Sequence, residues 1–265
     1  MKVNLHTHTH RCGHASGSER EYIERAIAGG ITHMGFSEHA PFAFPDGHES
    51  TYRVPMSQAK DYMDTVRALR EEYKNDIKIY VGFEMEYYPL YFRDMLNIVN
   101  GLGAEYLILG QHYVDNEYPP QSPYVCTPNL SEEKLCQYAD NVIEGIESGV
   151  FSYVAHPDVF NFFGDDEIYD RHMRRICKSA KEYGLPLEIN FLGIRSRRIY
   201  PKESFWRIAG EEGCEAVFGL DAHAPNNAYD EGSLPLAEWL VNKYGLKISE
   251  YPTLTDPKTN KKFEL

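Results

Sequence analysis

The stretch KVNLHTH, residues 2–8, contains the arrangement that recurs along this chain, an apolar strand pattern that ends in metal-binding side chains. Its two histidines, His6 and His8, are two positions apart, and side chains at that spacing project from the same face of a strand. The pair can therefore chelate one ion. An HxH pair alone is more often two surface histidines than a metal site, so its meaning depends on the rest of the chain.

Six further stretches have the apolar, β-branched or aromatic composition of strands. They recur at intervals of roughly 30 to 45 residues, about the size of a βα unit. In chain order, the predicted strands are 2–7, 33–37, 77–83, 106–110, 153–155, 186–190 and 216–220, with a possible short final strand in 245–251.

The segments between these strands have helical signatures. Ser18 and Glu21 form a capping-box pattern at the start of a helix that Gly29 would end. Asn129 and Glu132 predict another helix start in the same way. Helical periodicity marks further segments at 56–73, 166–183, 202–211 and 234–244.

Strands that alternate with helices favour a parallel sheet, and seven units in 265 residues favour closure of that sheet. We therefore predict a single α/β domain over residues 1–265, a distorted, TIM-like (β/α)7 barrel. In such a barrel the carboxyl ends of the strands form one mouth, where a metal site is expected. Two long loops, 40–55 and 114–128, are predicted lids or substrate walls, and the tail 255–265 is predicted to be a solvated terminus.

The composition excludes several classes of protein. Hydrophobic residues make up 42% and charged residues 25%, as in ordinary soluble domains, and no stretch is long and apolar enough for a membrane span. The start MKVNLHTHTH lacks the apolar segment of a secretory signal, so a cytoplasmic location is expected. The five cysteines are widely spaced without a CxxC pair and are expected to be reduced thiols.

The net charge argues against a long polyanionic partner. The chain has 27 Lys and Arg against 40 Asp and Glu, giving 27 − 40 = −13. Such a charge disfavours extended nucleic acid. A small phosphate ester is still compatible, because bound divalent cations would supply the local positive charge.

Potential metal ligands stand at the ends of nearly all the predicted strands. Taken singly, a histidine here is more often a core or loop residue, and a glutamate more often a surface charge. Their repeated placement at strand ends instead indicates one shared metal site. These residues are His6, His8, His39, Glu84, His112, His156, Asp221 and His223.

With these residues in order, the chain resembles the polymerase and histidinol phosphatase (PHP) family. The matching motifs are HTH at 6–8, His14 six residues later, SEH ending at His39, GFE ending at Glu84, GQH ending at His112, AHPD with His156, and LDAH with Asp221 and His223. The resemblance extends from residue 6 to residue 223.

The resemblance implies a centre of up to three divalent metal ions. It assigns the first ion to His6, His8, Glu84 and Asp221, the second to Glu84, His112 and His156, and the third to His14, His39 and His223. Imidazole and carboxylate ligands suit Zn, Mn or Fe, and the sequence does not choose among them. A hydroxide that bridges the first two ions would be the nucleophile, because coordination lowers the pKa of water.

Several other side chains are expected near the same mouth. The segment LEINFLGIRSRR brings Arg195, Arg197 and Arg198 there, and a guanidinium can hold phosphate in bidentate fashion. Arg195 and Arg197 are the preferred candidates, against the alternative of a solvated basic loop. Asp158 or His223 is expected to protonate the leaving group, and the residues next to ligands, Glu38 and Glu86, either orient histidines or lie on the surface.

The function implied is hydrolysis of a phosphate monoester, releasing phosphate from a small substrate, with L-histidinol phosphate as the best candidate within the family. The alternative is a PHP-type nuclease or nucleotide phosphodiesterase, for which a basic groove interleaved with aromatic residues is expected. A third class is a metal-binding protein without catalysis. Turnover of monoesters compared with diesters separates the first two.

Overall fold

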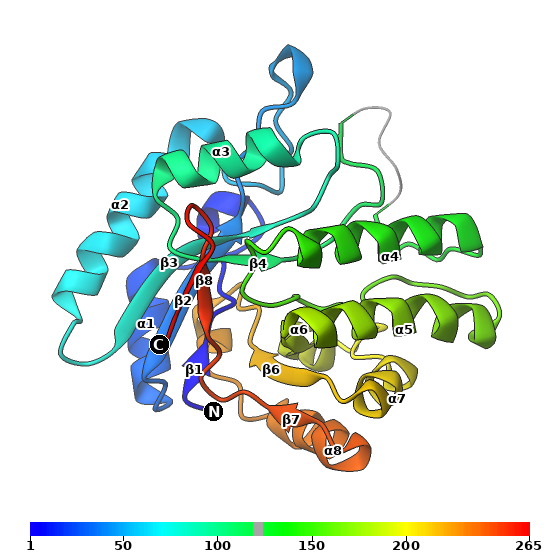
Figure 1. Ribbon diagram of the computed structural model, residues 1–265. Coiled ribbons are helices and arrows are strands. Elements are labelled where there is room, and N and C mark those ends of the chain that lie inside the picture. Colours follow the sequence, from blue (N-terminus) through cyan, green and yellow to red (C-terminus); the bar gives the residue numbers. More distant parts are fainter. Residues whose placement is uncertain (119–123) are drawn as a thin grey trace.

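The computed structural model of the protein describes residues 1–118 and 124–265 (Figure 1). Four parallel strands form the first sheet in the order β1 (Val3–Asn4), β2 (His33–His39), β3 (Lys78–Met85) and β4 (Leu107–Leu109). The register aligns the last residue of β2, His39, with Glu84 of β3. The predicted strands in this half are confirmed, with shifted ends.

A second parallel sheet contains β5 (Leu187–Asn190), β6 (Glu215–Gly219) and β7 (Lys247–Ile248). Single parallel bridges connect it to the first sheet, from Leu109 to Val154 and from Val154 to Leu187 on one side, and from Thr7 to Ala222 on the other. The result is a mixed α/β fold with a curled parallel sheet. The predicted strand 153–155 is thus reduced to one bridging residue, since the backbone turns at His156, where φ is +30°.

The helices flank the sheets. Figure 1 places α2 and α3 beside the first sheet and α4, α5 and α7 on the other side of the molecule. Helices α4 and α5 pack against each other, and α5 packs against α7. Their bounds are α1 (Glu19–Ala28), α2 (Met56–Glu72), α3 (Phe92–Leu102), α4 (Glu132–Glu147), α5 (Asp166–Tyr183), α6 (Phe191–Arg195), α7 (Glu203–Glu212) and α8 (Leu234–Tyr244), with short 3-10 turns at His10–Cys12, Pro45–Gly47 and Pro225–Ala228.

The helix starts show where local signals succeed. The capping box of Ser18 and Glu21 at the start of α1 is confirmed, with both reciprocal hydrogen bonds present. The predicted cap at Asn129 is wrong. Ser131 caps α4 by accepting a hydrogen bond from the Lys134 backbone N–H, while the Asn129 side chain accepts from the backbone N–H of Ser131.

Two helices, α3 and α6, were not anticipated from the sequence. In helix α3 the N-cap residue, Tyr91, makes no side-chain capping hydrogen bond. The C-cap residue, Gly103, has a left-handed conformation. Helix α6 has only five residues and directly follows β5, where the Asn190 side chain accepts from the Gly193 backbone N–H. A missing cap and a very short length remove the signals on which recognition of a helix depends.

The tail 255–265 is exposed over much of its length, as predicted, but it is folded and anchored at its start. The chain ends in an antiparallel hairpin of β8 (Leu254–Asp256) and β9 (Lys261–Phe263). Leu254 is fully buried in a cluster with Val3, Leu5 and Tyr106, and the Thr255 backbone N–H donates to the Ser152 hydroxyl. Leu254, with Phe263 and Leu265 packed against the same cluster, anchors a segment that is otherwise mostly polar. In the described part of the chain, no helix combines the length and apolar character needed to cross a membrane.

Candidate metal centre

The predicted ligands meet around one cavity of about 870 Å³. Most of them follow a strand or lie at its carboxyl end, whereas His14 follows the 3-10 turn His10–Cys12 and His156 follows the bridging residue Val154. His6 and His8 follow β1, His39 ends β2, Glu84 lies near the end of β3, His112 follows β4, and Asp221 with His223 follows β6. Eight of the nine predicted ligands line the cavity, namely His8, His14, His39, Glu84, His112, His156, Asp221 and His223, whereas His6 is completely buried next to them.

Glu84 is the centre of this group. Its Oε2 lies 3.4 Å from Nε2 of both His6 and His8 and 3.2 Å from Nδ1 of His39. Its Oε1 lies 2.8 Å from Nε2 of His156 and 3.5 Å from Nε2 of His112. One buried carboxylate therefore faces imidazoles from four other segments of the chain, the arrangement expected of a bridging ligand.

Asp221 approaches the same imidazoles from the other side. Its Oδ1 lies 3.6 Å from Nε2 of His6, 3.3 Å from Nε2 of His8 and 3.2 Å from Nδ1 of His223. Its backbone has a φ of +46°, a conformation that residues other than glycine rarely adopt. Such strain persists where surrounding contacts impose it, and it is common at functional sites.

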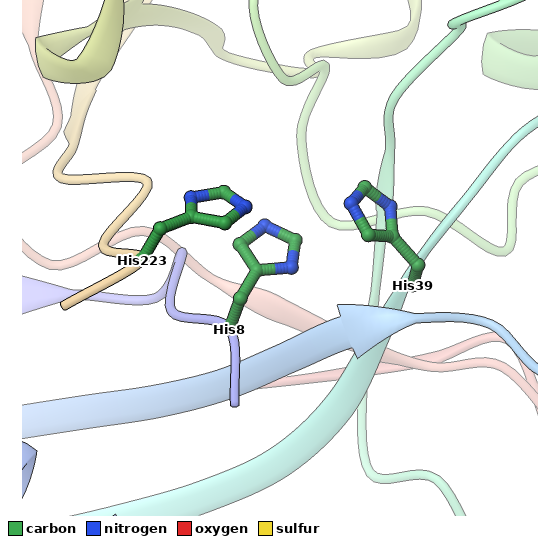
Figure 2. A group of neighbouring side chains, drawn as sticks. All are labelled: His8, His39 and His223. Atoms are coloured by element: carbon green, nitrogen blue, oxygen red, sulfur yellow. The ribbon is translucent and has the colours of Figure 1, made fainter. Parts of the chain in front are cut away.

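Figure 2 shows His8, His39 and His223 pointing toward one another from three different segments. The ring of His8 lies 4.4 Å from that of His39 and 4.2 Å from that of His223, measured between ring centroids. His14 lies 4.8 Å from the ring of His223. Groups of donor atoms close enough to share an ion overlap, so that His8 belongs both to the set with His6 and Asp221 and to the set with His39 and His223.

The donor atoms fit divalent metal ions. Several buried atoms directed at this centre have no hydrogen-bond partner, among them Nε2 of His6, Nε2 of His8, Oε2 of Glu84 and Oδ1 of Asp221. Unpaired buried polar atoms are costly, and a cation would satisfy all of them at once. Borderline imidazole nitrogens combined with carboxylate oxygens suit Zn, Mn or Fe.

A buried carboxylate supports each of three ligand histidines from behind. Nδ1 of His6 lies 2.8 Å from Glu188, Nδ1 of His8 lies 3.1 Å from Glu38, and Nδ1 of His112 lies 2.8 Å from Glu86. An Nδ1–H held in this way leaves Nε2 unprotonated and directed at the metal position. Glu38 and Glu86 thus contact histidines and do not lie on the surface, which was the other possibility that the sequence left open. Glu188 was not predicted from the sequence.

The electrostatics of the metal-free centre follow from burial and from mutual attraction. Burial lowers the pKa of His6 and His8, but the facing carboxylates raise it more, leaving the pKa of His6 well above its ordinary value and that of His8 at about 9. Burial and the neighbouring His8 hold the pKa of His39 well below the ordinary value. Burial raises the pKa of Glu84 and Asp221, yet the surrounding histidines bring both well below the usual range.

The three arginines of the segment 195–198 do not lie as expected, since the sequence favoured Arg195 and Arg197 for phosphate binding. Arg195 donates to the backbone carbonyls of Leu220 and Asp221, so its guanidinium supports the loop that carries Asp221. Arg197 is exposed, with a φ of +50°. Arg198 is the arginine of the three that lines the cavity, and its Nη1 donates to the Tyr200 hydroxyl at 3.2 Å.

Asp158 is only two residues from His156 in the sequence, but it is not among the residues that line the cavity. Its Oδ2 accepts from the Lys202 backbone N–H at 2.5 Å and from Nε1 of Trp206 at 3.0 Å. Burial raises the pKa of this carboxyl to about 6. It supports the start of α7, and of the two residues expected to supply a proton, His223 is the one at the cavity.

Aromatic residues from both predicted loops form the cavity wall. Tyr52 comes from the loop 40–55 and Tyr124 from the loop 114–128, and Tyr113 and Tyr200 also line the cavity. Both loops therefore act as walls, although residues 119–123 of the second lie outside the described residues. A charged residue within the apolar strand LEIN was the available signal for Glu188. Nothing local distinguishes the wall tyrosines from the others.

Comparison with known proteins places this geometry in context. The family model named PHP domain matches residues 4–191. A probable histidinol-phosphatase of Deinococcus radiodurans is 27% identical over 228 residues, covering 83% of this chain and 85% of that protein. The histidinol-phosphatase of Lactococcus lactis is 28% identical over 278 residues, covering 98% and 97%.

Among solved structures, the histidinol phosphate phosphatase of Lactococcus lactis, in complex with zinc, L-histidinol and phosphate, has the same fold. It superposes with a TM-score of 0.73 at 19% identity and covers 99% of this chain and 98% of its own. The family model covers more than half of the chain, and the matched range includes most of the residues that converge on the cavity. The chain therefore belongs to the PHP domain family.

Proposed function

We propose that this protein is a metal-dependent phosphomonoester hydrolase that acts on L-histidinol phosphate and releases phosphate. The observation that carries the proposal is the convergence of nine ordered histidine and carboxylate ligands on one cavity. The names of the relatives from Deinococcus and Lactococcus point to the same substrate. The two relatives match 83% and 98% of the chain, so the likeness is not confined to one segment.

The proposed centre holds up to three divalent ions, Zn, Mn or Fe, in a single domain whose strands close into a distorted (β/α)7 barrel. The three bridges that connect the two sheets support closure, with Val154 in the place of the fifth strand. The first two ions would be held by His6, His8, Glu84, His112, His156 and Asp221, and the third by His14, His39 and His223. The unpaired donor atoms support these assignments.

When bound, the ions supply positive charge for the phosphoryl oxygens and acidify water. The chain's own contribution begins with Arg198, whose guanidinium can donate to phosphate oxygens that the ions leave exposed. Arg198 replaces Arg195 and Arg197 as the phosphate-binding arginine, because it lines the cavity. The tyrosine wall excludes water from the leaving group and favours a flat or cationic substituent.

His223 is the proposed source of a proton for the leaving alkoxide when it is not occupied as a ligand. Its Nδ1 lies 3.2 Å from Oδ1 of Asp221, which fixes the ring. Burial and the neighbouring His8 lower the pKa of His223, which makes its protonated form a stronger acid but less populated at neutral pH. Asp158 is not proposed for this role, since Lys202 and Trp206 occupy its carboxylate.

Turnover of a phosphate-ester panel by purified protein loaded with one defined metal tests the proposal. L-Histidinol phosphate is expected to be the best substrate, with other small phosphomonoesters slower and phosphodiesters slowest. Failure to hydrolyse any monoester under every metal condition would refute the proposal. Preferential cleavage of a dinucleotide or an oligonucleotide would instead support the nuclease alternative.

A further inference from the structure

Glu188 is a completely buried carboxylate beneath the metal centre. Its Oε1 lies 2.8 Å from Nδ1 of His6. Its Oε2 accepts from the His156 backbone N–H at 3.0 Å and from Nδ2 of Asn190 at 2.9 Å. In the described residues, His6 is its one ion-pair partner within 4 Å, and neither lysine nor arginine reaches it. A buried charge of this kind is costly unless a nearby cation compensates it.

Asn190 extends the contacts of Glu188 to a third ligand. Its Nδ2 donates both to Oε2 of Glu188 and, at 3.1 Å, to Oδ2 of Asp221. Its Oδ1 accepts from the Gly193 backbone N–H, which fixes the side chain at the start of α6. Two alternate residues of β5 therefore hold His6, His156 and Asp221, three ligands from segments far apart in the sequence.

The neighbouring strand leaves room for the Glu188 carboxylate. A Cβ atom at Gly219 of β6 would lie 1.7 Å from Oε1 of Glu188 and 2.3 Å from its Cδ. Glycine at position 219 is therefore required for the carboxylate to lie where it does. A similar relation holds for the central ligand, since a Cβ at Gly110 would lie 1.9 Å from Oε1 of Glu84.

Two of these three ligands, His156 and Asp221, have a strained backbone. The φ angles of His156 and Asp221 are +30° and +46°, in a region that costs of order 1 kcal/mol or more for residues with a side chain. The hydrogen bond from the His156 N–H to Glu188 and that from Asn190 to Asp221 stabilise these conformations. The network thereby offsets the strain that directs both side chains at the centre.

We propose that Glu188, linked to Asp221 through Asn190, is a positioning residue that sets the geometry and metal affinity of the part of the centre formed by His6, His156 and Asp221. It holds Nδ1–H of His6, so that Nε2 is the unprotonated nitrogen. The negative charge also raises the basicity of that ligand. This inference rests on the metal centre of the proposed function but not on the identity of the substrate.

Glutamine at position 188 has nearly the same shape but cannot reproduce these contacts. If its carbonyl oxygen faces His6, its amide NH₂ faces two other donors, the His156 N–H and the Asn190 amide. If it is flipped, the NH₂ donates to Nδ1 of His6, which places the ring proton on Nε2 and blocks metal binding there. Either orientation disrupts one ligand.

The test compares Glu188→Gln with the wild type in three measurements that need no substrate. Zinc affinity is measured by competition with a chelator, zinc content by elemental analysis, and coordination by the visible spectrum of the cobalt-substituted protein. We expect zinc to bind about 10- to 100-fold more weakly, the range found when partners of metal-bound histidines are removed. We also expect an altered cobalt spectrum and a lower kcat with a nearly unchanged KM.

Glu105→Gln is the matched control. Glu105 also accepts from a backbone N–H, that of Val81, and pairs with Arg70, but it precedes the amino-terminal end of β4, whereas the predicted ligands lie at or after the carboxyl ends of strands. Glu105→Gln is expected to leave zinc affinity and the cobalt spectrum unchanged. Wild-type zinc affinity and an unchanged cobalt spectrum in folded Glu188→Gln would overturn the proposal, whatever the variant does to thermal stability.

Asn190→Ser keeps the proposal testable if Glu188→Gln does not fold. Serine retains a helix cap for α6 but removes the amide that joins Glu188 to Asp221. We expect a smaller loss of zinc affinity in the same direction, and affinity equal to the wild type would contradict the role of Asn190. Because these measurements involve no phosphate ester, a failed substrate panel and a failed positioning role give separate results.

Discussion

Three of the predicted ligand histidines depend on the side chain behind them. The imidazoles of His6, His8 and His112 each have Nδ1 within 3.1 Å of a buried carboxylate. This contact selects the tautomer and fixes the ring, so that the residue type alone does not define the ligand. The sequence identified the histidines, and two of their three carboxylate partners were recognised because they stand next to ligands in the chain.

Arg198 is the residue on which phosphate binding is expected to depend. Arg198→Ala removes a charge-assisted hydrogen bond worth about 1.5–3 kcal/mol, so kcat/KM should fall about 10- to 100-fold, mainly through a higher KM. Steady-state kinetics on the metal-loaded protein measure the effect. The exposed Arg197 provides the control, and an Arg197→Ala variant more impaired than Arg198→Ala would reverse the assignment.

Asp158 gives a prediction for stability against pH. Its folded-state pKa of about 6 is above the ordinary value of about 3.9, so the folded protein binds this proton more tightly than the unfolded chain does. Stability is therefore lost as pH rises between about 4 and 6, by at most about 3 kcal/mol. Asp158→Asn should remove this loss and gain stability relative to the wild type between pH 4 and pH 7.

Denaturant unfolding of the metal-free wild type and of Asp158→Asn, at pH 4 and at pH 7, measures the difference in their free energies of unfolding. Asn can still accept from Lys202 and Trp206, which keeps the start of α7 intact. A wild type and a variant that change in parallel with pH would show that the carboxyl titrates normally. Substantial kcat in the variant is also expected, because Asp158 faces away from the cavity.

The strands and their neighbours decide where the ligands can lie. Parallel strands place their carboxyl ends at one mouth, and His39 and Glu84 are aligned by the register of β2 and β3. The glycines at 110 and 219 then allow carboxylates to lie across the adjacent strand. Close approach of a side chain to a backbone is one of the reasons for glycine in a strand.

Gly110→Ala should therefore displace the central ligand. The added methyl group would lie 1.9 Å from Oε1 of Glu84, and a shift of about 1 Å at a catalytic group costs about 100-fold in rate. We expect a kcat loss of that order together with reduced metal content by elemental analysis. In contrast, Gly101→Ala in α3 meets nothing within 4 Å and should stabilise the helix by up to about 1 kcal/mol.

At the scale of the whole molecule, the buried histidines and carboxylates of the centre form a dense set of charges. Bound cations would change the protonation of these groups. In the metal-free protein the facing carboxylates outweigh burial, raising the pKa of His6 and bringing that of His8 to about 9, which favours protonated imidazoles at neutral pH. Metal ligation requires their neutral form. Zinc binding at pH 7 should therefore release protons, and zinc affinity should increase as pH rises from 6 to 8.

Calorimetric titration in buffers of different ionisation enthalpy counts the released protons. The stability of the metal-free protein, measured by thermal unfolding, should change with pH in the opposite direction to the zinc affinity. The raised pKa of His8 contributes stability that is fully present below about 6.5 and is lost as pH rises through about 9. An identical binding enthalpy in all buffers would show that these imidazoles are already neutral before zinc binds.

Much of this protein could be predicted from local sequence. Strand periodicity identified six of the seven expected strands, and the capping box located the start of α1, because both depend on neighbours within a few residues. The ligands were found because parallel topology brings strand ends together, whatever the details of packing. The short helix α6, the uncapped helix α3 and the terminal hairpin were missed, since tertiary contacts rather than local signals stabilise them.

The sequence by itself determined the order of the ligands, the alternation of strands and helices, and the family. Only the tertiary structure decided which of three arginines faces the cavity, that Asp158 supports α7 instead of the site, and that Glu188 lies beneath His6, 182 residues away in the chain. The physical reason is that these roles depend on contacts across the curled sheet. A residue's own neighbours in sequence carry little information about which distant atom its side chain will meet.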